Sequence, residues 1–323
     1  MKVLHITNNF PTKQYPIFGI FVKEQIDSMS NLGVVNEVFF INGRELGRKA
    51  YWSSIKKLRK KLKISDYDIL HCHHSFSAII LFLTFKFFKF KKIISYQNPP
   101  EKEGGLFLFR LVNIFFNVII VKNISESVSN NTKVNYLPNG VNTEFFKPQD
   151  VKKSLRELKL DANKKYILFM DSYKRRTQKR VDRFDEVINI LLKNGNPHNI
   201  EPLVLTNTDR SLIPAYMSVS SLHLLTSDFE GSPNSVKECL ACNTPVVSCP
   251  VGNVDDLIGD VAGCYVSESF EPKVLSRLVL KCLERKSFNG RDKLLLKKLD
   301  INSVALNLEA IYKSMIENGK HKK

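Results

Sequence analysis

The feature that most constrains the fold of this chain is an alternation of short apolar segments with longer helical patterns, and it occurs twice. In the N-terminal half, β-branched runs occupy 2–7, 37–41, 68–71, 92–96, 117–121 and 134–137. The pattern starts again at 166–170 and continues at 202–205, 222–225, 245–248 and 264–266. Strands that alternate with helices in this way form parallel sheets. The sequence therefore predicts an α/β protein made of two Rossmann-like halves.

A turn-rich passage from Leu137 to Pro148 separates the two series of strands. We place the linker near residue 150, because a chain of 323 residues is long enough for two cores. The expected parts are an N-terminal domain over 1–150, a C-terminal domain over 151–300, and a helix with a basic tail over 301–323. We expect that helix to pack back on the N-terminal domain. Ligands of parallel sheets bind beyond the carboxyl ends of the strands, so two facing sheets predict an interdomain cleft.

The formal net charge of +17 fits nucleic acid, an anionic membrane and anionic substrates alike. The densest basic run is 56–63, and a second run over 85–92 interleaves lysine with phenylalanine. Two interpretations stay open, solvated helix ends or a membrane-facing patch. The apolar stretch 76–85 is too short to span a membrane, and 106–121 has a polar stripe that predicts a buried helix followed by a strand.

The N-terminus lacks the pattern of a signal peptide, and six cysteines without such a signal indicate reduced thiols. We therefore expect a cytoplasmic protein that can bind peripherally to the inner face of the cell membrane.

The most informative segment runs from Ser227 to Val247 and reads as strand, glycine turn, helix and a strand begun by proline. Its turn, Gly231-Ser232-Pro233, lets the backbone approach a ligand closely. The helix that opens near Asn234 would direct free N–H groups at a phosphate or a sugar hydroxyl. Glu230 and Glu238 can address different ends of one elongated ligand. The alternative is that both are surface carboxylates near a helix N-terminus.

This segment resembles the Glu-x7-Glu signature of the retaining glycosyltransferases of family 4, whose typical string is Glu-Gly-x-Pro-Asn followed by x-x-x-Glu-Ala-x-Ala-Cys-Gly-x-Pro-Val-Val. The passage 137–148 resembles that family's interdomain segment, and 9–25 resembles its first loop and helix. The resemblance implies a GT-B fold with two facing Rossmann-like domains. It also implies transfer of a sugar from a UDP- or GDP-sugar to an acceptor hydroxyl, with retention of configuration and without a metal or another cofactor.

The resemblance also implies roles for individual residues. Glu238 would bind the nucleotide ribose, and Glu230 would contact the donor sugar. Lys179 matches the lysine that neutralises the leaving diphosphate, whereas Ser172 stands where the family has an arginine, so Arg175 or Arg176 would replace it. The alternative for this loop is a solvated basic segment. The expected donor-binding residues are Gly19, Arg175, Arg176, Lys179, Glu230, Gly231, Ser232, Pro233, Asn234, Ser235 and Glu238.

Three histidines lie where a strand of the N-terminal half runs into a loop, and alternation places His71 and His73 on the same face. His73 best matches a histidine that lines the family's site, so it joins Glu230 and Lys179 as a catalytic candidate; a core histidine is the alternative. A zinc site would need a further ligand at suitable spacing, so we expect no metal. The acceptor-side candidates are His73, His74, Gln97, Asn98 and Glu101.

The expected function is glycosyl transfer to a glycan in cell-surface polysaccharide synthesis, and the basic, phenylalanine-rich N-terminal half favours a lipid-linked acceptor. The expected partners are a nucleotide-sugar donor, this acceptor and an anionic membrane surface, and no nucleic acid. The alternative is a catalytically degenerate GT-B protein that binds membranes or polyanions, for which the altered loop at Asp171 and Ser172 is an argument. Salt-sensitive polyanion binding without nucleotide-sugar binding would favour it. Residues 7–12 contain no glycine, which argues against a dinucleotide-dependent dehydrogenase.

Overall fold

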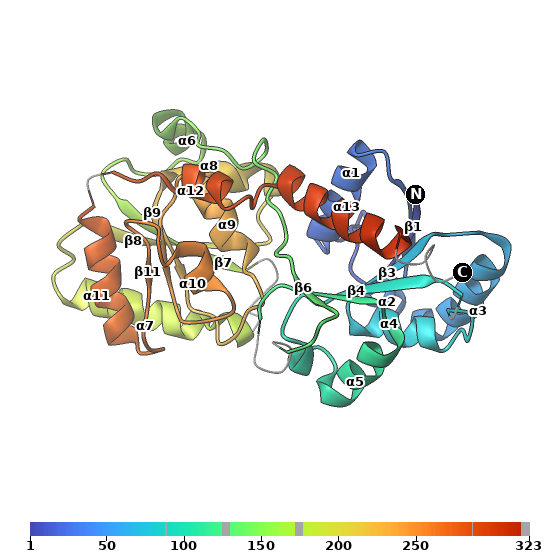
Figure 1. The fold of residues 1–323 in the computed structure, drawn as a ribbon. Helices are drawn as coiled ribbons and strands as arrows, with labels where there is room; N and C mark the ends of the chain where they lie inside the picture. The colour runs from blue at the N-terminus through green and yellow to red at the C-terminus, as the bar shows by residue number, and fades with distance from the viewer. Residues whose placement is uncertain (88, 125–129, 172–176, 286, 318–323) are drawn as a thin grey trace. The chain divides into compact units, whose positions relative to one another are not determined.

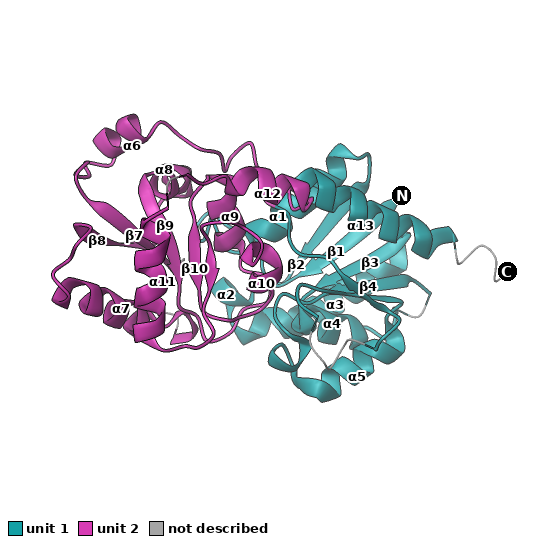
Figure 2. Ribbon diagram, turned by 60° about the vertical axis from the view of Figure 1, so that its left-hand side comes forward, with its two compact units in different colours: residues 1–140, 301–323 teal, residues 141–300 magenta. Residues whose placement is uncertain are grey.

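The computed structural model describes residues 1–87, 89–124, 130–171, 177–285 and 287–317 (Figure 1). The chain forms two compact units (Figure 2). Unit 1 comprises Met1–Gly140 with Ile301–Lys323, and unit 2 comprises Val141–Asp300. Each unit is built on its own parallel sheet, so the predicted α/β fold with two parallel sheets is confirmed.

The sheet of unit 1 has six strands in the order β2-β1-β3-β4-β5-β6. They are β1 (Lys2–Thr7), β2 (Val35–Phe40), β3 (Ile69–His73), β4 (Lys91–Ser95), β5 (Val118–Val121) and β6 (Val134–Tyr136). Chain order reverses between β1 and β3, which pair in parallel with Thr7 opposite His73. In sheets of this kind, ligands bind outside the carboxyl ends at such a reversal.

Helices cover both faces of this sheet because alternate strand residues point to opposite sides. On one face, Val3 and Ile69 pack against Met29 of α1 (Ile20–Asn31) and against Leu308 and Tyr312 of α13 (Ile301–Glu317). The last helix of the chain therefore belongs to the core of unit 1. The other face packs against α3 (Arg48–Ile64), α4 (Ser75–Phe82) and α5 (Gly105–Phe115). The short α2 (Gly43–Leu46) and the 3-10 helix η1 (Pro100–Lys102) complete the unit.

Unit 2 repeats the architecture with five strands in the order β11-β10-β9-β7-β8. They are β7 (Lys165–Asp171), β8 (Ile200–Thr206), β9 (Ser220–Leu225), β10 (Val246–Ser248) and β11 (Tyr265–Val266). Its helices are α6 (Val151–Glu157), α7 (Val181–Lys193), α8 (Ile213–Val219), α9 (Asn234–Ala241), α10 (Val254–Ile258), α11 (Pro272–Leu283) and α12 (Gly290–Leu296), with 3-10 turns η2 (Thr177–Lys179) and η3 (Arg210–Leu212). Here chain order reverses between β7 and β9. Lys179 and Glu230 lie in the connections that follow those two strands.

Within the described part of the chain, no helix combines the length and the apolar character needed to cross a bilayer.

Candidate functional site

The glycine turn of unit 2 is buried and is held in place by a neighbouring loop. The N–H of Asn253 donates a hydrogen bond of 3.1 Å to the carbonyl of Gly231. Gly252 has a φ of +57°, and a Cβ atom there would lie 2.4 Å from the same carbonyl oxygen. Both the left-handed backbone and the close contact require glycine at position 252. The loop after β10 therefore fixes the turn that precedes α9.

Glu230 meets Lys179 beside this turn. The Nζ atom of Lys179 lies 2.6 Å from Oε1 of Glu230, and the two side chains are only 10% and 12% exposed. The hydroxyl of Ser227 donates to the same carboxylate oxygen at 2.8 Å. Two residues that the sequence predicts for the donor site therefore form one nearly buried ion pair.

Hydrogen bonds tie together the two loops that carry this pair. The amide of Gln178 donates to the carbonyl of Phe229 at 2.7 Å, and the N–H of Asp228 donates to the carbonyl of Gln178 at 2.9 Å. The hydroxyl of Thr226 donates to the carbonyl of Lys179 at 3.0 Å. These bonds fix the backbone on both sides of the Lys179–Glu230 pair.

Two arginines that follow Lys179 in the chain form ion pairs with one aspartate. Arg180 and Arg183 both contact Oδ1 of Asp228, at 2.9 and 2.8 Å. The residues predicted to supply the second cation for a diphosphate, Arg175 and Arg176, lie outside the described residues, as does Ser172. Lys179 is therefore the member of the predicted basic pair that the structure places.

The N-terminus of α9 lies next to the turn, and no side chain of the described residues caps it. Its first N–H groups therefore keep donor capacity for a ligand. Oδ1 of Asn234, the first residue of the helix, is buried and has no hydrogen-bond partner among the described residues. Glu238 lies further along the helix and is half-buried. The Nζ atom of the buried Lys237 contacts the hydroxyl of Ser232 at 3.0 Å.

A buried histidine on β9 forms a hydrogen bond with the first turn of α9. Nδ1 of His223 lies 3.0 Å from the carbonyl of Leu168, so it carries the proton, and Nε2 accepts from the hydroxyl of Ser235 at 3.1 Å. Burial lowers the pKa of His223 to about 4. The ring is therefore neutral at physiological pH and fixes the Ser235 hydroxyl.

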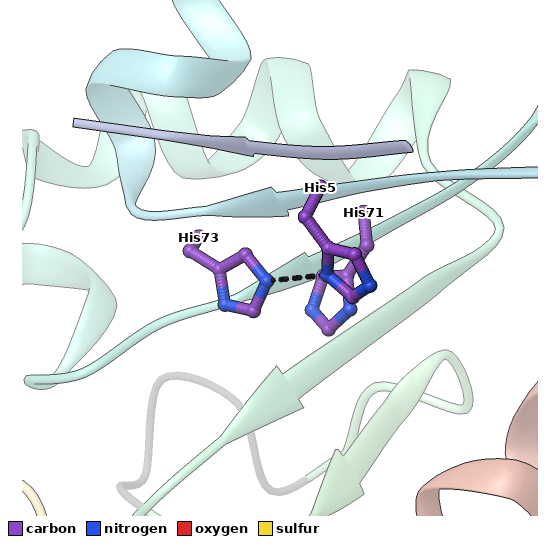
Figure 3. A group of neighbouring side chains, drawn as sticks. All are labelled: His5, His71 and His73. Atoms are coloured by element: carbon purple, nitrogen blue, oxygen red, sulfur yellow. Dashed lines mark hydrogen bonds between the residues drawn. The ribbon is translucent and has the colours of Figure 1, made fainter. Parts of the chain in front are cut away.

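Three histidines of unit 1 come together on the sheet face that packs against α1 and α13 (Figure 3). Nδ1 of His5 lies 2.9 Å from Nε2 of His73, and Nε2 of His5 lies 2.9 Å from Oδ1 of Asn36. His71 lies between the hydroxyls of Tyr312, at 2.5 Å, and Ser95, at 2.8 Å. Burial lowers the pKa of His5 to about 4 and holds the pKa values of His71 and His73 well below their usual range. All three rings are therefore neutral.

One ring nitrogen from each histidine lies within 4.8 Å of the other two, which raises the question of a metal. The rings of His71 and His73 are stacked with centroids 4.0 Å apart and planes 21° apart. Lone pairs lie in the ring planes, so those of His71 and His73 do not converge on one point. Both nitrogens of His5 and of His71 also have hydrogen-bond partners. The group is a hydrogen-bonded stack, in which Nδ1 of His73 finds no partner within the described part of the chain.

A buried carboxylate organises the loop after β4. Oε1 of Glu103 accepts hydrogen bonds from the N–H groups of Gln97 and Asn98 at 2.6 and 2.7 Å. Its other oxygen lies 3.7 Å from Nε2 of His74. Burial raises the pKa of Glu103 to about 7. Predicted acceptor-side residues His74, Gln97 and Asn98 are thus gathered around Glu103, while the predicted Glu101 lies half-buried in η1.

Further polar groups extend this cluster. The amide of Asn139 donates to the side-chain oxygen of Gln97 at 3.0 Å. Nζ of Lys122, at the end of β5, donates to the carbonyl of Leu137 at 2.8 Å, and burial lowers its pKa to about 7. The carboxyl ends of β3, β4 and β5 thus carry a buried polar cluster.

No protein-family model matches the chain, and no curated protein matches it. Among solved structures, sucrose-phosphate synthase from Thermosynechococcus elongatus has a TM-score of 0.76 at 13% identity, over 98% of this chain and 100% of that chain. Anabaena HepE in complex with UDP has a TM-score of 0.69 at 14% identity, over 97% and 100%. The lipopolysaccharide outer core galactosyltransferase WaaB has a TM-score of 0.66 at 13% identity, over 97% and 100%. The chain has the GT-B fold.

Sequence reasoning missed several residues of this GT-B chain. His5 lies on β1, far from the other histidines in sequence, and the parallel register that sets it opposite His71 was the signal that could have found it. No local sequence pattern marks Glu103, Lys122 or Gly252 as residues of a site. Gly19, a predicted donor residue, has a φ of +68°, and a Cβ there would lie 2.3 Å from the backbone of Asn9, so its local packing by itself requires glycine.

Proposed function

We propose that this GT-B protein is a retaining glycosyltransferase that moves a sugar from a nucleotide-diphosphate donor to a hydroxyl of a glycan. The observation that carries the proposal is the Lys179–Glu230 pair, which lies beside a buried glycine turn and an uncapped helix N-terminus. A leaving diphosphate gains negative charge as its bond to the sugar breaks. A fixed cation and free N–H groups in a partly dry site stabilise that charge.

The roles follow from the chemistry of the groups at the turn. Lys179 neutralises the diphosphate, and Glu230 both orients Lys179 and accepts hydrogen bonds from hydroxyls of the donor sugar. The backbone from Gly231 to Asn234 holds phosphate and sugar oxygens, and the unpartnered amide oxygen of Asn234 accepts from a donor hydroxyl. Glu238, eight positions after Glu230, binds the ribose, as the Glu-x7-Glu signature of family 4 implies.

The reaction needs no protein nucleophile. The acceptor oxygen attacks the anomeric carbon from the side of the leaving group, so configuration is retained. The bond between the anomeric carbon and the phosphate oxygen breaks, and the departing phosphate takes the proton of the acceptor hydroxyl. Lys179 carries out the charge stabilisation that a metal performs in other transferases, so we propose a metal-independent reaction.

Unit 1 supplies the acceptor groups in this proposal. The candidates are the cluster around Glu103 and His73, whose buried Nδ1 has no partner among the residues that the structure describes. The acceptor we propose is a lipid-linked glycan, built at the inner face of the cell membrane for cell-surface polysaccharide. The similarity of fold to WaaB, which is described as a lipopolysaccharide outer core galactosyltransferase, supports this choice. The complex of HepE with UDP makes a UDP-sugar the first donor to test.

A donor-hydrolysis assay tests the proposal. Purified protein is incubated with UDP-glucose, UDP-galactose or GDP-mannose in EDTA, and release of the nucleotide and the anomer of the product are followed by NMR. We expect slow release of one nucleotide, with the anomeric configuration of the donor retained, and no loss of rate in EDTA. Release of the inverted sugar, or a strict need for a divalent cation, would contradict the proposed mechanism.

A further inference from the structure

Helix α3 of unit 1 has an unusual charge distribution. It contains eight basic residues and no acidic one. Its inner side is apolar, and Ala50, Leu58 and Leu62 are buried. Its outer side carries an exposed basic strip formed by Lys56, Lys57, Arg59, Lys60 and Lys63. Lys61 pairs with Glu37 at 2.7 Å, but no member of the basic strip has an ion pair among the described residues.

The same outer side carries an exposed indole. Trp52 is the only tryptophan of the chain, and 73% of it is exposed. It precedes Lys56 by four positions and Arg59 by seven, so the three side chains share one side of the helix. Ile64, at the end of α3, is 74% exposed. An indole at such a position, with aliphatic and cationic neighbours, has the amphipathic character favoured at membrane interfaces.

Neighbouring helices add apolar groups to this layer, which covers the lower face of the unit 1 sheet in Figure 2. Phe76, at the start of α4, is 52% exposed and its ring lies 6.2 Å from that of Tyr51 on α3. On α5, Phe107 and Ile114 are 75% and 67% exposed. The sequence-based expectation that this helix is buried is therefore wrong, because only its inner side packs against the sheet.

We propose that the outer side of α3, with the exposed apolar side chains of α4 and α5, docks unit 1 on an anionic lipid bilayer. This inference rests on the proposed function, because a lipid-linked acceptor lies in that bilayer. The basic strip binds lipid phosphates, and Trp52, Phe107 and Ile114 enter the headgroup region. A nucleic acid would use the cations and the indole, but it gives no role to the exposed aliphatic side chains.

Trp52 reports directly on this surface because no other tryptophan contributes to the emission. Full-length protein is titrated with vesicles made of equal parts of phosphatidylcholine and phosphatidylglycerol, and with vesicles of phosphatidylcholine alone, at physiological ionic strength. We expect a blue shift of the emission and protection from acrylamide with the anionic vesicles, and co-sedimentation with them. The triple variant Lys56→Glu, Lys60→Glu, Lys63→Glu should bind at least roughly tenfold more weakly, since each basic residue near an anionic leaflet strengthens binding severalfold.

A matched variant distinguishes binding by this particular surface from binding that depends only on the net charge of the protein. Lys152→Glu, Lys193→Glu, Lys273→Glu changes the charge equally at exposed positions of unit 2, and it should bind vesicles like the unchanged protein. Equal loss in both variants, or no emission shift with anionic vesicles, overturns the proposal. A shift with single-stranded RNA but not with vesicles overturns it in favour of nucleic acid. Titration of the same samples with UDP keeps the two proposals apart, because vesicle binding without UDP binding contradicts only the proposed function.

Discussion

Lys179 and Glu230 are 51 positions apart in the chain, yet Nζ of one lies 2.6 Å from Oε1 of the other. They lie in the connections after β7 and β9, at the reversal of strand order in the sheet of unit 2. A nearly buried ion pair gives little net stability, because desolvation offsets the attraction. Its place beside an uncapped helix start is better explained by a ligand that both residues contact.

Replacement of Lys179 tests that explanation. We expect Lys179→Met to lower the rate of donor cleavage by roughly 10²–10³-fold, because the departing diphosphate loses its stabilising charge. Chemical denaturation should show the double variant Lys179→Met, Glu230→Gln to be more stable than Lys179→Met, since no carboxylate is left unpaired. The double variant should stay inactive. Recovery of activity together with stability would assign the pair a purely structural role.

Gly252 provides a test of the turn. In Gly252→Ala, the added Cβ would lie 2.4 Å from the carbonyl oxygen of Gly231, so the turn before α9 must move. Gly195→Ala is the matched control, because Gly195 also has a positive φ but nothing within 4 Å of its added Cβ. Both variants should lose about 1–2 kcal/mol of unfolding free energy from backbone strain. Calorimetry should show that only Gly252→Ala loses affinity for UDP. Equal UDP affinity in the two variants would contradict the turn's role.

The buried histidines predict a pH dependence of stability. His5 and His223 have pKa values lowered to about 4 by burial, so below pH 6.5 the unfolded chain binds protons that the folded chain does not. The contribution of these two rings to stability should therefore be complete above pH 6.5, fall as the pH decreases, and level off near pH 4. Each unit of pKa difference contributes about 1.4 kcal/mol. Urea unfolding at a series of pH values measures this slope, and a flat profile between pH 6.5 and 4.5 would contradict the neutral, buried rings.

Tyr312 links the last helix to the histidine stack. In Tyr312→Phe, Nδ1 of His71 loses the hydroxyl 2.5 Å away and stays buried. The variant should lose about 1–3 kcal/mol of unfolding free energy, the usual cost of an unsatisfied buried polar group. Hydrogen exchange should show faster opening of α13. Unchanged exchange in α13 would mean that apolar contacts such as that of Leu308 hold the helix without this bond.

Much of the fold could be predicted because the information is local. Alternation of apolar runs with helical patterns predicted the two parallel sheets, and β1 and β3 lie where the runs at 2–7 and 68–71 indicated, within a residue or two. The roles of individual site residues stay predictions, although the structure does bring Lys179 and Glu230 together. Contacts between residues far apart in the chain could not be predicted from the sequence. Strand register places His5 opposite His71 and within hydrogen-bond distance of His73, and backbone conformation decides that position 252 must be glycine.

The acceptor side shows a further limit of sequence reasoning. Glu101 and Glu103 are equally plausible from composition. Only the path of the chain through η1 determines that Glu103 receives the N–H groups of Gln97 and Asn98. The burial of one side of α5 and the exposure of the other likewise depend on which face meets the sheet. The expectation of a buried helix with one polar stripe was therefore wrong, since Phe107 and Ile114 are exposed.

The most direct test of the account is calorimetric titration of the protein with UDP and GDP, with Glu238→Ala as the site variant and Glu157→Ala, on the exposed part of α6, as the control. The account predicts micromolar binding of one nucleotide to the unchanged protein and to Glu157→Ala, and loss of that binding in Glu238→Ala. Nucleotide binding that survives in Glu238→Ala, or binding of neither nucleotide to the unchanged protein, would contradict a donor site at the start of α9.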